Sequence, residues 1–263
     1  MLGAIIGDLA GSIYEFDQVK KHKSISITNI IEKDSFYSDD TILTIAIADA
    51  IINNKDYEST LKEYALTYEN NIPTHIPYFK TMFSPGFISW AKSAAQGKSL
   101  GNGAMMRISP VGYLFNTEED IRKNAFLATI PSHNTDEAIN CATIVALIIF
   151  YARNGCSKQE IIEKLNLNIK KPNVNKFNYT CTDTIDICLY SLFNSNSFEE
   201  SIKTSISFGG DTDTNACIVG SMAEAMFGID KNLQKQALNK LPKEFISIIN
   251  KSYEGMSNTE LID

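Results

Sequence analysis

Three glycines recur at four-residue spacing near the start of the chain: Gly3, Gly7 and Gly11. This spacing places all three on one face of an α-helix, so residues 2–14 are predicted to form a helix with one bare face. A glycine inside a helix costs about 1 kcal/mol relative to alanine. Close approach by another backbone must offset that cost, so the pattern predicts a tight packing contact.

Helical periodicity extends through the rest of the sequence, and strand patterns are sparse. Residues 212–227 carry a second bare stripe at Ala216, Gly220 and Ala223, and residues 135–153 are apolar nearly all round, as in a central, fully buried helix. With no linker or repeat, the sequence predicts an all-α fold: one compact orthogonal bundle of many helices, a single domain spanning residues 1–263. The other predicted helices are 40–53, 58–70, 86–97, 103–115, 118–130, 158–165, 181–193, 197–207, 231–240 and 242–253.

Composition restricts the partners. The 263 residues are 44% hydrophobic, enough for a substantial core, and the net charge is −7. The longest basic cluster is Lys20-Lys21-His22-Lys23, which argues against nucleic acid as a partner. The longest apolar run, residues 144–152, is too short to span a bilayer. Five cysteines without a Cys-x-x-Cys pair suggest reduced, buried thiols. We therefore expect a cytoplasmic protein, a monomer, with no membrane partner.

Two short acidic segments each precede a predicted helix, Ser38-Asp39-Asp40-Thr41 and Gly209-Gly210-Asp211-Thr212-Asp213-Thr214. Taken singly, each is explained by helix capping. Together they offer more oxygen donors than two caps require, and clustered carboxylates favour a hard divalent cation between them. The number suits two octahedral ions that share a carboxylate and keep several waters. The candidate ligands are Ser38, Asp39, Asp40, Asp211, Asp213 and Thr214.

Three further features are candidates for substrate contact. Gly101-Asn102-Gly103 opens a predicted helix, and such a loop is either a plain turn or a cradle for diphosphate or ribose. His133 precedes the apolar 135–153 helix and is either structural or a ligand contact; with only three histidines in the chain, a zinc site is poorly supported. Gly86, in Ser84-Pro85-Gly86, is a weaker loop candidate.

Jointly these motifs resemble the ADP-ribosylglycohydrolase family, which includes the dinitrogenase-reductase-activating glycohydrolases and the ADP-ribosylhydrolases of vertebrates. The resemblance spans nearly the whole chain, and the Gly-Gly-Asp-Thr-Asp-Thr segment is its most specific part. The matching pieces are Gly3 to Asp8, Glu15-Phe16, Ser38 to Thr41, Gly101 to Arg107 continuing to Pro110, Ser132-His133, and Phe208 to Ala216 with Gly220.

The resemblance implies a metal-dependent hydrolase that removes ADP-ribose from an arginine or serine side chain of a protein, or from a small ADP-ribosyl compound. It implies that the six oxygen donors bind two Mg²⁺ or Mn²⁺ ions, with serine at position 38 where many relatives have threonine. Glu15, which we place at the end of the first helix, and Asp213 become the catalytic candidates. Asn102, Gly103 and His133 resemble residues that hold ADP-ribose, and Asp8 resembles a residue that orients the ligands.

Two alternatives remain open. One is a non-catalytic ADP-ribose-binding module, which has no need for six retained metal donors. The other is a two-metal nucleotide phosphohydrolase, although all-α enzymes of the His-Asp type need a His-Asp pair that this chain lacks.

Overall fold

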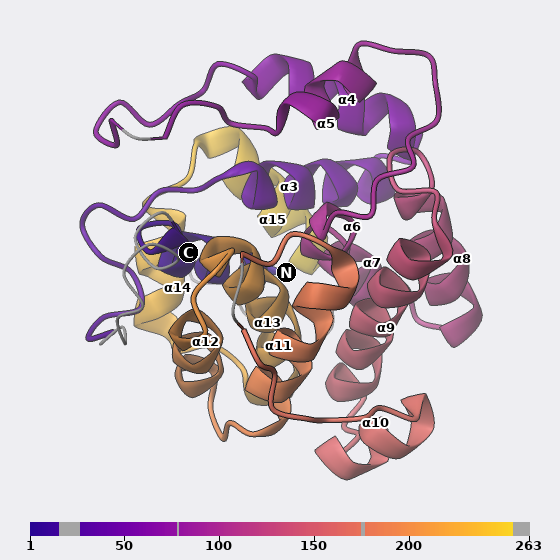
Figure 1. The fold of residues 1–263 in the computed structure, drawn as a ribbon, viewed down its shortest axis with the longest axis vertical. Helices are drawn as coiled ribbons and strands as arrows, with labels where there is room; N and C mark the ends of the chain where they lie inside the picture. The colour runs from indigo at the N-terminus through magenta and orange to yellow at the C-terminus, as the bar shows by residue number, and fades with distance from the viewer. Residues whose placement is uncertain (16–26, 78, 175–176, 255–263) are drawn as a thin grey trace.

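The computed structural model describes residues 1–15, 27–77, 79–174 and 177–254 (Figure 1). Within these ranges the chain is helical apart from loops and two isolated bridges, Lys98 with His133 and Gly101 with Thr180, which confirms the all-α prediction. The basic cluster at residues 20–23 lies outside the described ranges. The helices are α1 (Leu2–Gly11), α3 (Asp39–Ile52), α4 (Tyr57–Tyr68), α5 (Pro85–Ala91), α6 (Gly103–Met106), α7 (Ser109–Leu114), α8 (Glu118–Thr129), α9 (Asp136–Arg153), α10 (Lys158–Leu165), α11 (Cys181–Phe193), α12 (Phe198–Ser207), α13 (Thr212–Phe227), α14 (Lys231–Leu238) and α15 (Lys243–Glu254).

The glycine face of α1 packs directly against α13, as the spacing predicts. A Cβ added at Gly3 would lie 2.2 Å from the carbonyl oxygen of Gly220, and one added at Gly7 would lie 1.9 Å from that of Ala216. No side chain fits at such distances, so the two backbones touch. All ten residues of α1 are buried, which makes α1 and α13 the centre of the fold.

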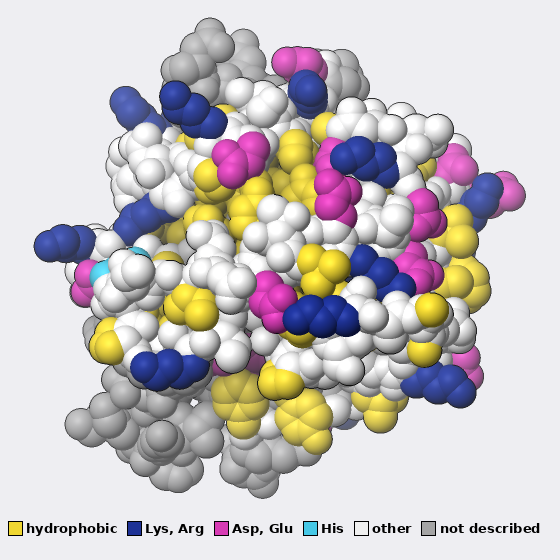
Figure 2. Space-filling view, turned by 90° about the horizontal axis from the view of Figure 1, so that it is seen from above, with side chains coloured by type: hydrophobic (Ala, Val, Ile, Leu, Met, Phe, Trp, Pro, Cys, Tyr) yellow, Lys and Arg dark blue, Asp and Glu magenta, His cyan; other side chains and the backbone are white. Residues whose placement is uncertain are grey.

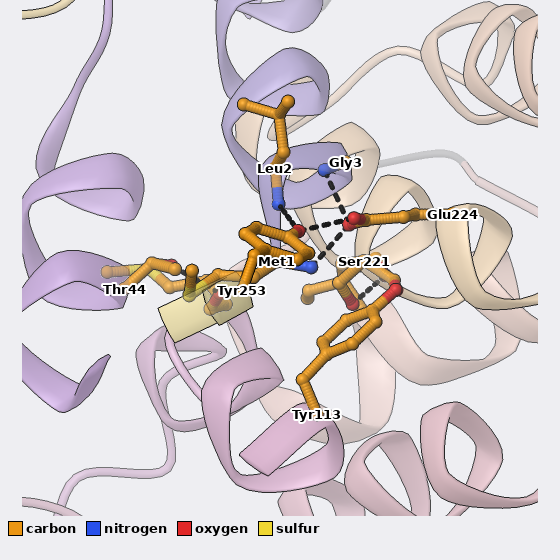
Figure 3. A network of polar contacts seen from close by, with 10 residues as sticks. Met1, Leu2, Gly3, Thr44, Tyr113, Ser221, Glu224 and Tyr253 are labelled. Atoms are coloured by element: carbon orange, nitrogen blue, oxygen red, sulfur yellow. Dashed lines mark hydrogen bonds and ion pairs between the residues drawn. The ribbon is translucent and has the colours of Figure 1, made fainter. Parts of the chain in front are cut away.

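Polar contacts fasten this central pair to α15 (Figure 3). The amino group of Met1 and the backbone N–H of Gly3 both donate to Glu224 Oε2 on α13, the latter over 2.7 Å. The backbone N–H of Leu2 donates to the hydroxyl of Tyr253 on α15 over 2.8 Å, and that hydroxyl donates to Glu224 Oε1. One half-buried glutamate on α13 therefore connects the start of the chain to α15 near its other end.

The remaining helices surround the pair in layers. In Figure 1, α3 lies above α1, and α4 and α5 lie above α3. Helices α8 and α9 flank one side, α12 and α14 the other, and α10 lies at the lower end. The buried apolar side chains form one continuous cluster.

Two predicted helices are shorter than expected. The 103–115 segment divides into α6 and α7, because Pro110 near the start of α7 has no N–H to continue a helix from α6. The 86–97 segment ends at Ala91, where the Ser93 hydroxyl donates to the carbonyl of Trp90 over 3.0 Å and competes with the helical pattern.

Two other expectations need correction. Helix α1 ends at Gly11, so Glu15 follows a turn and does not end that helix. Helix α9 is not fully buried, because Ile139 and Ile144 are half-buried. Apolar residues all round a helix therefore do not predict full burial here, whereas α1, with its glycine stripe, is buried along its whole length.

All five cysteines are free thiols, and only Cys156 is not fully buried. Among the described residues, no helix is both long and apolar enough to cross a membrane. Acidic and basic side chains are interspersed on the face that Figure 2 shows, without a concentrated basic area there.

Candidate active site

A cavity of about 740 Å³ opens between the amino-terminal ends of α3 and α13, helix α5, and the loop before α6. Its volume suits a ligand of nucleotide size. The residues that line it include nearly all the sequence candidates: Glu15, Asp39, Asp40, Gly86, Gly101, Asn102, Gly103, His133, Asp211, Asp213 and Thr214.

The floor of the cavity is acidic. Two groups of three carboxylates that have Asp213 in common lie at this floor, although Asp8, in one of them, does not line the cavity. One group adds Asp8 and Asp40, and the other adds Glu15 and Asp211; within each group, oxygen atoms lie within 4.8 Å of one another. A shared carboxylate is what the sequence predicts for a pair of ions. Asp39 lines the same cavity, half-buried, but belongs to neither group.

Asp8 on α1 holds the first turn of α3 in place. Its Oδ2 accepts hydrogen bonds from the backbone N–H groups of Ser38 (2.9 Å) and Thr41 (3.1 Å) and from the Thr41 hydroxyl (2.5 Å). Its Oδ1 accepts from the Ser38 hydroxyl over 2.8 Å. These contacts fit the orienting role that the resemblance implies for Asp8.

Within the described ranges, one carboxylate oxygen of Asp40 has no hydrogen-bond donor. Its Oδ2 lies 3.1 Å from the hydroxyl of Ser38 and 3.3 Å from that of Thr214. Its Oδ1 is buried and has no hydrogen-bond partner among the described residues. A buried carboxylate oxygen left without a donor is costly, and a cation would supply what is missing.

The electrostatics of the floor indicate the same need. Burial, followed by repulsion from Asp213, raises the pKa of Asp40 well above its usual range. The same two causes raise the pKa of Asp8 to about 7 and that of Glu15 to about 11. Several carboxyl groups that cannot all ionise together, with only oxygen donors around them, fit Mg²⁺ or Mn²⁺.

The Gly-Gly turn before α13 aims Asp211 into the cavity. Gly209 and Gly210 adopt positive φ angles of 72° and 75°, which side-chain-bearing residues rarely do. A Cβ at Gly210 would lie 2.2 Å from Asn178 Oδ1, which also accepts from the backbone N–H of Asp211 over 3.1 Å. Asp211 makes no side-chain cap to α13, so capping alone does not explain this acidic segment, whereas Ser38 does cap α3.

The glycine loop meets the acidic floor through Asn102. Its Nδ2 donates to Asp211 Oδ2 over 2.7 Å and lies 3.3 Å from the hydroxyl of Thr184. The loop is fixed from behind, because the backbone N–H of Asn102 donates to the carbonyl of Tyr179 over 2.9 Å. Asn102 therefore orients a carboxylate as well as facing the cavity.

His133 borders the same loop. A Cβ at Gly103 would lie 3.4 Å from its Nε2, and one at Gly101 would lie 3.6 Å away. The imidazole is buried, and burial together with the nearby Arg107 cation holds its pKa well below 6.5. His133 is therefore neutral at physiological pH.

Some residues of the cavity carried no clear signal in the sequence. One wall of the cavity is apolar and consists of Phe83, Phe87 and Trp90. In the sequence, such aromatic residues are indistinguishable from ordinary helix-packing residues. Asn178, which binds Asp211, lies in a loop without periodicity. Lys98 lines the cavity and pairs with His133 in an antiparallel bridge, so the two side chains lie on one face.

Residues 1–260 match the sequence model described as ADP-ribosylglycohydrolase. The ADP-ribosylarginine hydrolase Tri1 of Pseudomonas putida is 22% identical, over 93% of this chain and 76% of its own length. The ADP-ribosylhydrolase ARH3 of Danio rerio is 24% identical, over 88% of this chain and 82% of its own.

A solved structure described as an ADP-ribosylglycohydrolase-related protein complex superposes with a TM-score of 0.71. It covers 96% of both chains at 17% sequence identity. At that identity the likeness concerns the fold.

Proposed function

Because the chain belongs to the ADP-ribosylglycohydrolase family and is thus a hydrolase that releases ADP-ribose, we propose that it does so in the acidic cleft with two divalent cations, Mg²⁺ or Mn²⁺, bound there. The observation that carries this proposal is the two groups of three carboxylates that share Asp213, beside a buried Asp40 oxygen that has no donor in the described part of the chain. The proposed ligands are Ser38, Asp39, Asp40, Asp211, Asp213 and Thr214, with Glu15 close enough to contribute.

When bound, the cations would supply positive charge that orients the distal ribose and polarises a water molecule. The residues of the chain supply the rest. Asp8 keeps the α3 segment in register, and Asn102 holds Asp211. These contacts fix the floor before substrate arrives, which lowers the cost of ordering it during the reaction.

The reaction we propose is a hydrolysis with oxocarbenium character. A water oxygen bonds to the anomeric carbon of the distal ribose as the bond from that carbon to the acceptor nitrogen or oxygen breaks. The leaving group takes a proton. Glu15 and Asp213 are the candidates to accept and donate protons, because both carboxyl groups border the cavity where the anomeric carbon would lie.

The substrate side of the cleft suits ADP-ribose. Gly101, Asn102 and Gly103 leave room beside the neutral imidazole of His133 for ribose and diphosphate. The aromatic wall of Phe83, Phe87 and Trp90 offers a stacking surface for a base. The acceptor is an arginine or serine side chain of a protein, or a small ADP-ribosyl compound. Tri1 acts on ADP-ribosylarginine by its name, which makes arginine the linkage to test first.

A product assay tests the function. We expect free ADP-ribose from ADP-ribosylated arginine or serine peptides in Mg²⁺ or Mn²⁺, and none in chelator. Binding without product would favour the ADP-ribose-binding module, and release of phosphate or a mononucleotide would favour the phosphohydrolase. We further propose a cytoplasmic monomer that binds neither nucleic acid nor membrane, which size-exclusion chromatography and cell fractionation would test.

A further inference from the structure

A fully buried arginine lies behind His133. Arg107 directly follows the last residue of α6 and is 0% exposed. Its Nη2 donates to the Ser132 hydroxyl over 2.7 Å and to the carbonyl of Ala128 over 3.2 Å. Its guanidinium carbon lies 5.9 Å from the ring centre of Phe87, in the wall of the cavity.

Burying the guanidinium of Arg107 costs folding free energy. Its Nε and Nη1 are buried without a hydrogen-bond partner among the described residues. Burial lowers the pKa of Arg107 to about 10, so it remains charged at neutral pH. A buried cation with so few partners destabilises the fold. Its presence therefore indicates that the contacts it does make have a function.

The contact with Ser132 has a specific consequence. Ser132 Oγ also lies 2.7 Å from Nδ1 of His133. An arginine can only donate, so the Ser132 oxygen accepts from Arg107 and its single hydrogen is available for Nδ1. If Nδ1 carried a proton instead, the buried serine hydrogen would have no acceptor among the described residues. The arrangement therefore favours a proton on Nε2.

Backbone hydrogen bonds hold the Ser132–His133 segment against the segment at Gly97. Gly97 accepts from the backbone N–H of Asn134 over 3.0 Å, and its own N–H donates to the carbonyl of Pro131 over 2.8 Å. A Cβ at Gly97 would lie 2.3 Å from the carbonyl oxygen of Ser132. The backbone at Ser132 and His133 is thus held against the segment at Gly97, and the ring of His133 lies beside Gly103.

We infer that Arg107 is a positioning residue: through Ser132, it fixes His133 as the neutral tautomer that presents an Nε2–H donor to the substrate cleft. The substrate half of this inference rests on the proposed function, since the donor is placed where Gly101 and Gly103 leave room for ribose and diphosphate. The tautomer half concerns the free protein and stands independently.

Nitrogen NMR of the full chain labelled with ¹⁵N-histidine tests the tautomer. The chain has only three histidines, so a His133→Gln spectrum assigns the signals. We expect Nδ1 of His133 to be unprotonated and Nε2 to be protonated at neutral pH. A protonated Nδ1 in the unaltered protein would overturn the inference.

Matched variants test the cause. Ser132→Thr keeps the hydroxyl, whereas Ser132→Val introduces a side chain with the shape of threonine but without the hydroxyl. We expect the Thr variant to retain the Nε2–H tautomer and the Val variant to give a mixture. Arg107→Met, which keeps the bulk of the side chain, should also give a mixture if it folds by circular dichroism. An unchanged tautomer in Ser132→Val would show that the arginine–serine contact does not set it, and would overturn the inference even if Arg107→Met failed to fold.

Kinetics separate this inference from the proposed function. Ser132→Val should raise KM for the ADP-ribosyl substrate about 2- to 10-fold, the effect of one weakened hydrogen bond, with kcat nearly unchanged. If the tautomer shifts but KM does not, Arg107 still orients the imidazole, but the donor does not serve the substrate and that half is wrong. If no substrate is turned over at all, the proposed function fails, while the NMR result stands.

Discussion

The side-chain nitrogen of Asn102 donates to Asp211 Oδ2 over 2.7 Å, so the glycine loop and the acidic floor are joined by one hydrogen bond between residues 109 positions apart. A loop expected only to hold substrate therefore also orients a proposed metal ligand. Changes in the loop should affect metal affinity as well as substrate affinity.

Asn102→Ala should weaken cation binding by about 10- to 100-fold, the usual effect of removing a residue that orients a ligand. Isothermal titration with Mn²⁺ measures this directly. Asn134→Ala is the matched control, because its side chain donates to the exposed Gln96 and makes no hydrogen bond to a carboxylate of the described residues. Equal Mn²⁺ affinity in the Asn102 variant and the parent would contradict the orienting role.

Metal should stabilise the fold, since bound cations relieve repulsion among the floor carboxylates. We expect the melting temperature to rise with Mg²⁺ or Mn²⁺ concentration. Asp213→Asn removes the carboxylate common to both groups, so it should melt higher than the parent in chelator and respond little to metal. Identical melting curves of the parent protein in chelator and in excess cation would rule out the site.

The stabilisation of the fold by bound cations should increase with pH. Without a cation, the folded-state pKa of Asp8 is about 7 against an ordinary 3.8, because of burial and then repulsion from Asp213. The folded state then binds more protons than the unfolded state between these values, so this contribution to stability is present below pH 3.8 and is lost as pH rises through 7. Cations require ionised carboxylates and act in the opposite sense.

The difference in melting temperature between saturating Mg²⁺ and chelator should therefore widen from pH 5 to pH 8. Taking the difference removes the titration of groups elsewhere in the chain. A difference that is constant or shrinks over this range would contradict the assignment of the floor as a cation site.

Gly7→Ala should destabilise the fold severely, by about 1–3 kcal/mol or more, because the new methyl would lie 1.9 Å from the backbone of α13. Urea unfolding measures the loss. Gly86→Ala is the control: an added Cβ there meets nothing within 4 Å, and alanine suits the first turn of α5. Equal stability of the two variants would mean that the α1–α13 contact is looser than described.

The sequence predicted those features that depend on local patterns. The glycine stripe on α1 and the acidic segments at the starts of α3 and α13 are periodic or contiguous, and the structure brings them together. Pro110 is a helix-breaking residue within the predicted 103–115 helix, but the apolar residues on both sides of it have the pattern of one continuous helix.

Other features depend on contacts between distant residues, which a single sequence does not reveal. Asn178 reaches Asp211 across 33 positions, and Arg107 reaches Ser132 across 25. Asn178 lies in a segment of ordinary composition, and Arg107 and Ser132 belong to motifs that do not show that the two residues meet. The depth of α9 was misjudged for the same reason, since apolar residues on a helix do not specify which neighbours cover them.

Substitutions of His133 and Asp213 should affect different kinetic constants: the first should change KM and the second kcat. The imidazole borders the glycine loop and belongs to neither carboxylate group, so we expect its contact with substrate to be equally strong in the ground and transition states. His133→Ala should therefore raise KM and largely spare kcat. Asp213 belongs to both carboxylate groups of the proposed cation site, where we expect charge to develop as the glycosidic bond breaks. Asp213→Ala should lower kcat by about 100-fold or more even at saturating substrate, since several kcal/mol of transition-state stabilisation depend on the site. Steady-state kinetics on an ADP-ribosylarginine peptide, with circular dichroism to verify folding, distinguish the two effects. A folded Asp213→Ala enzyme with near-normal kcat would show that the two-cation site is not the catalytic centre.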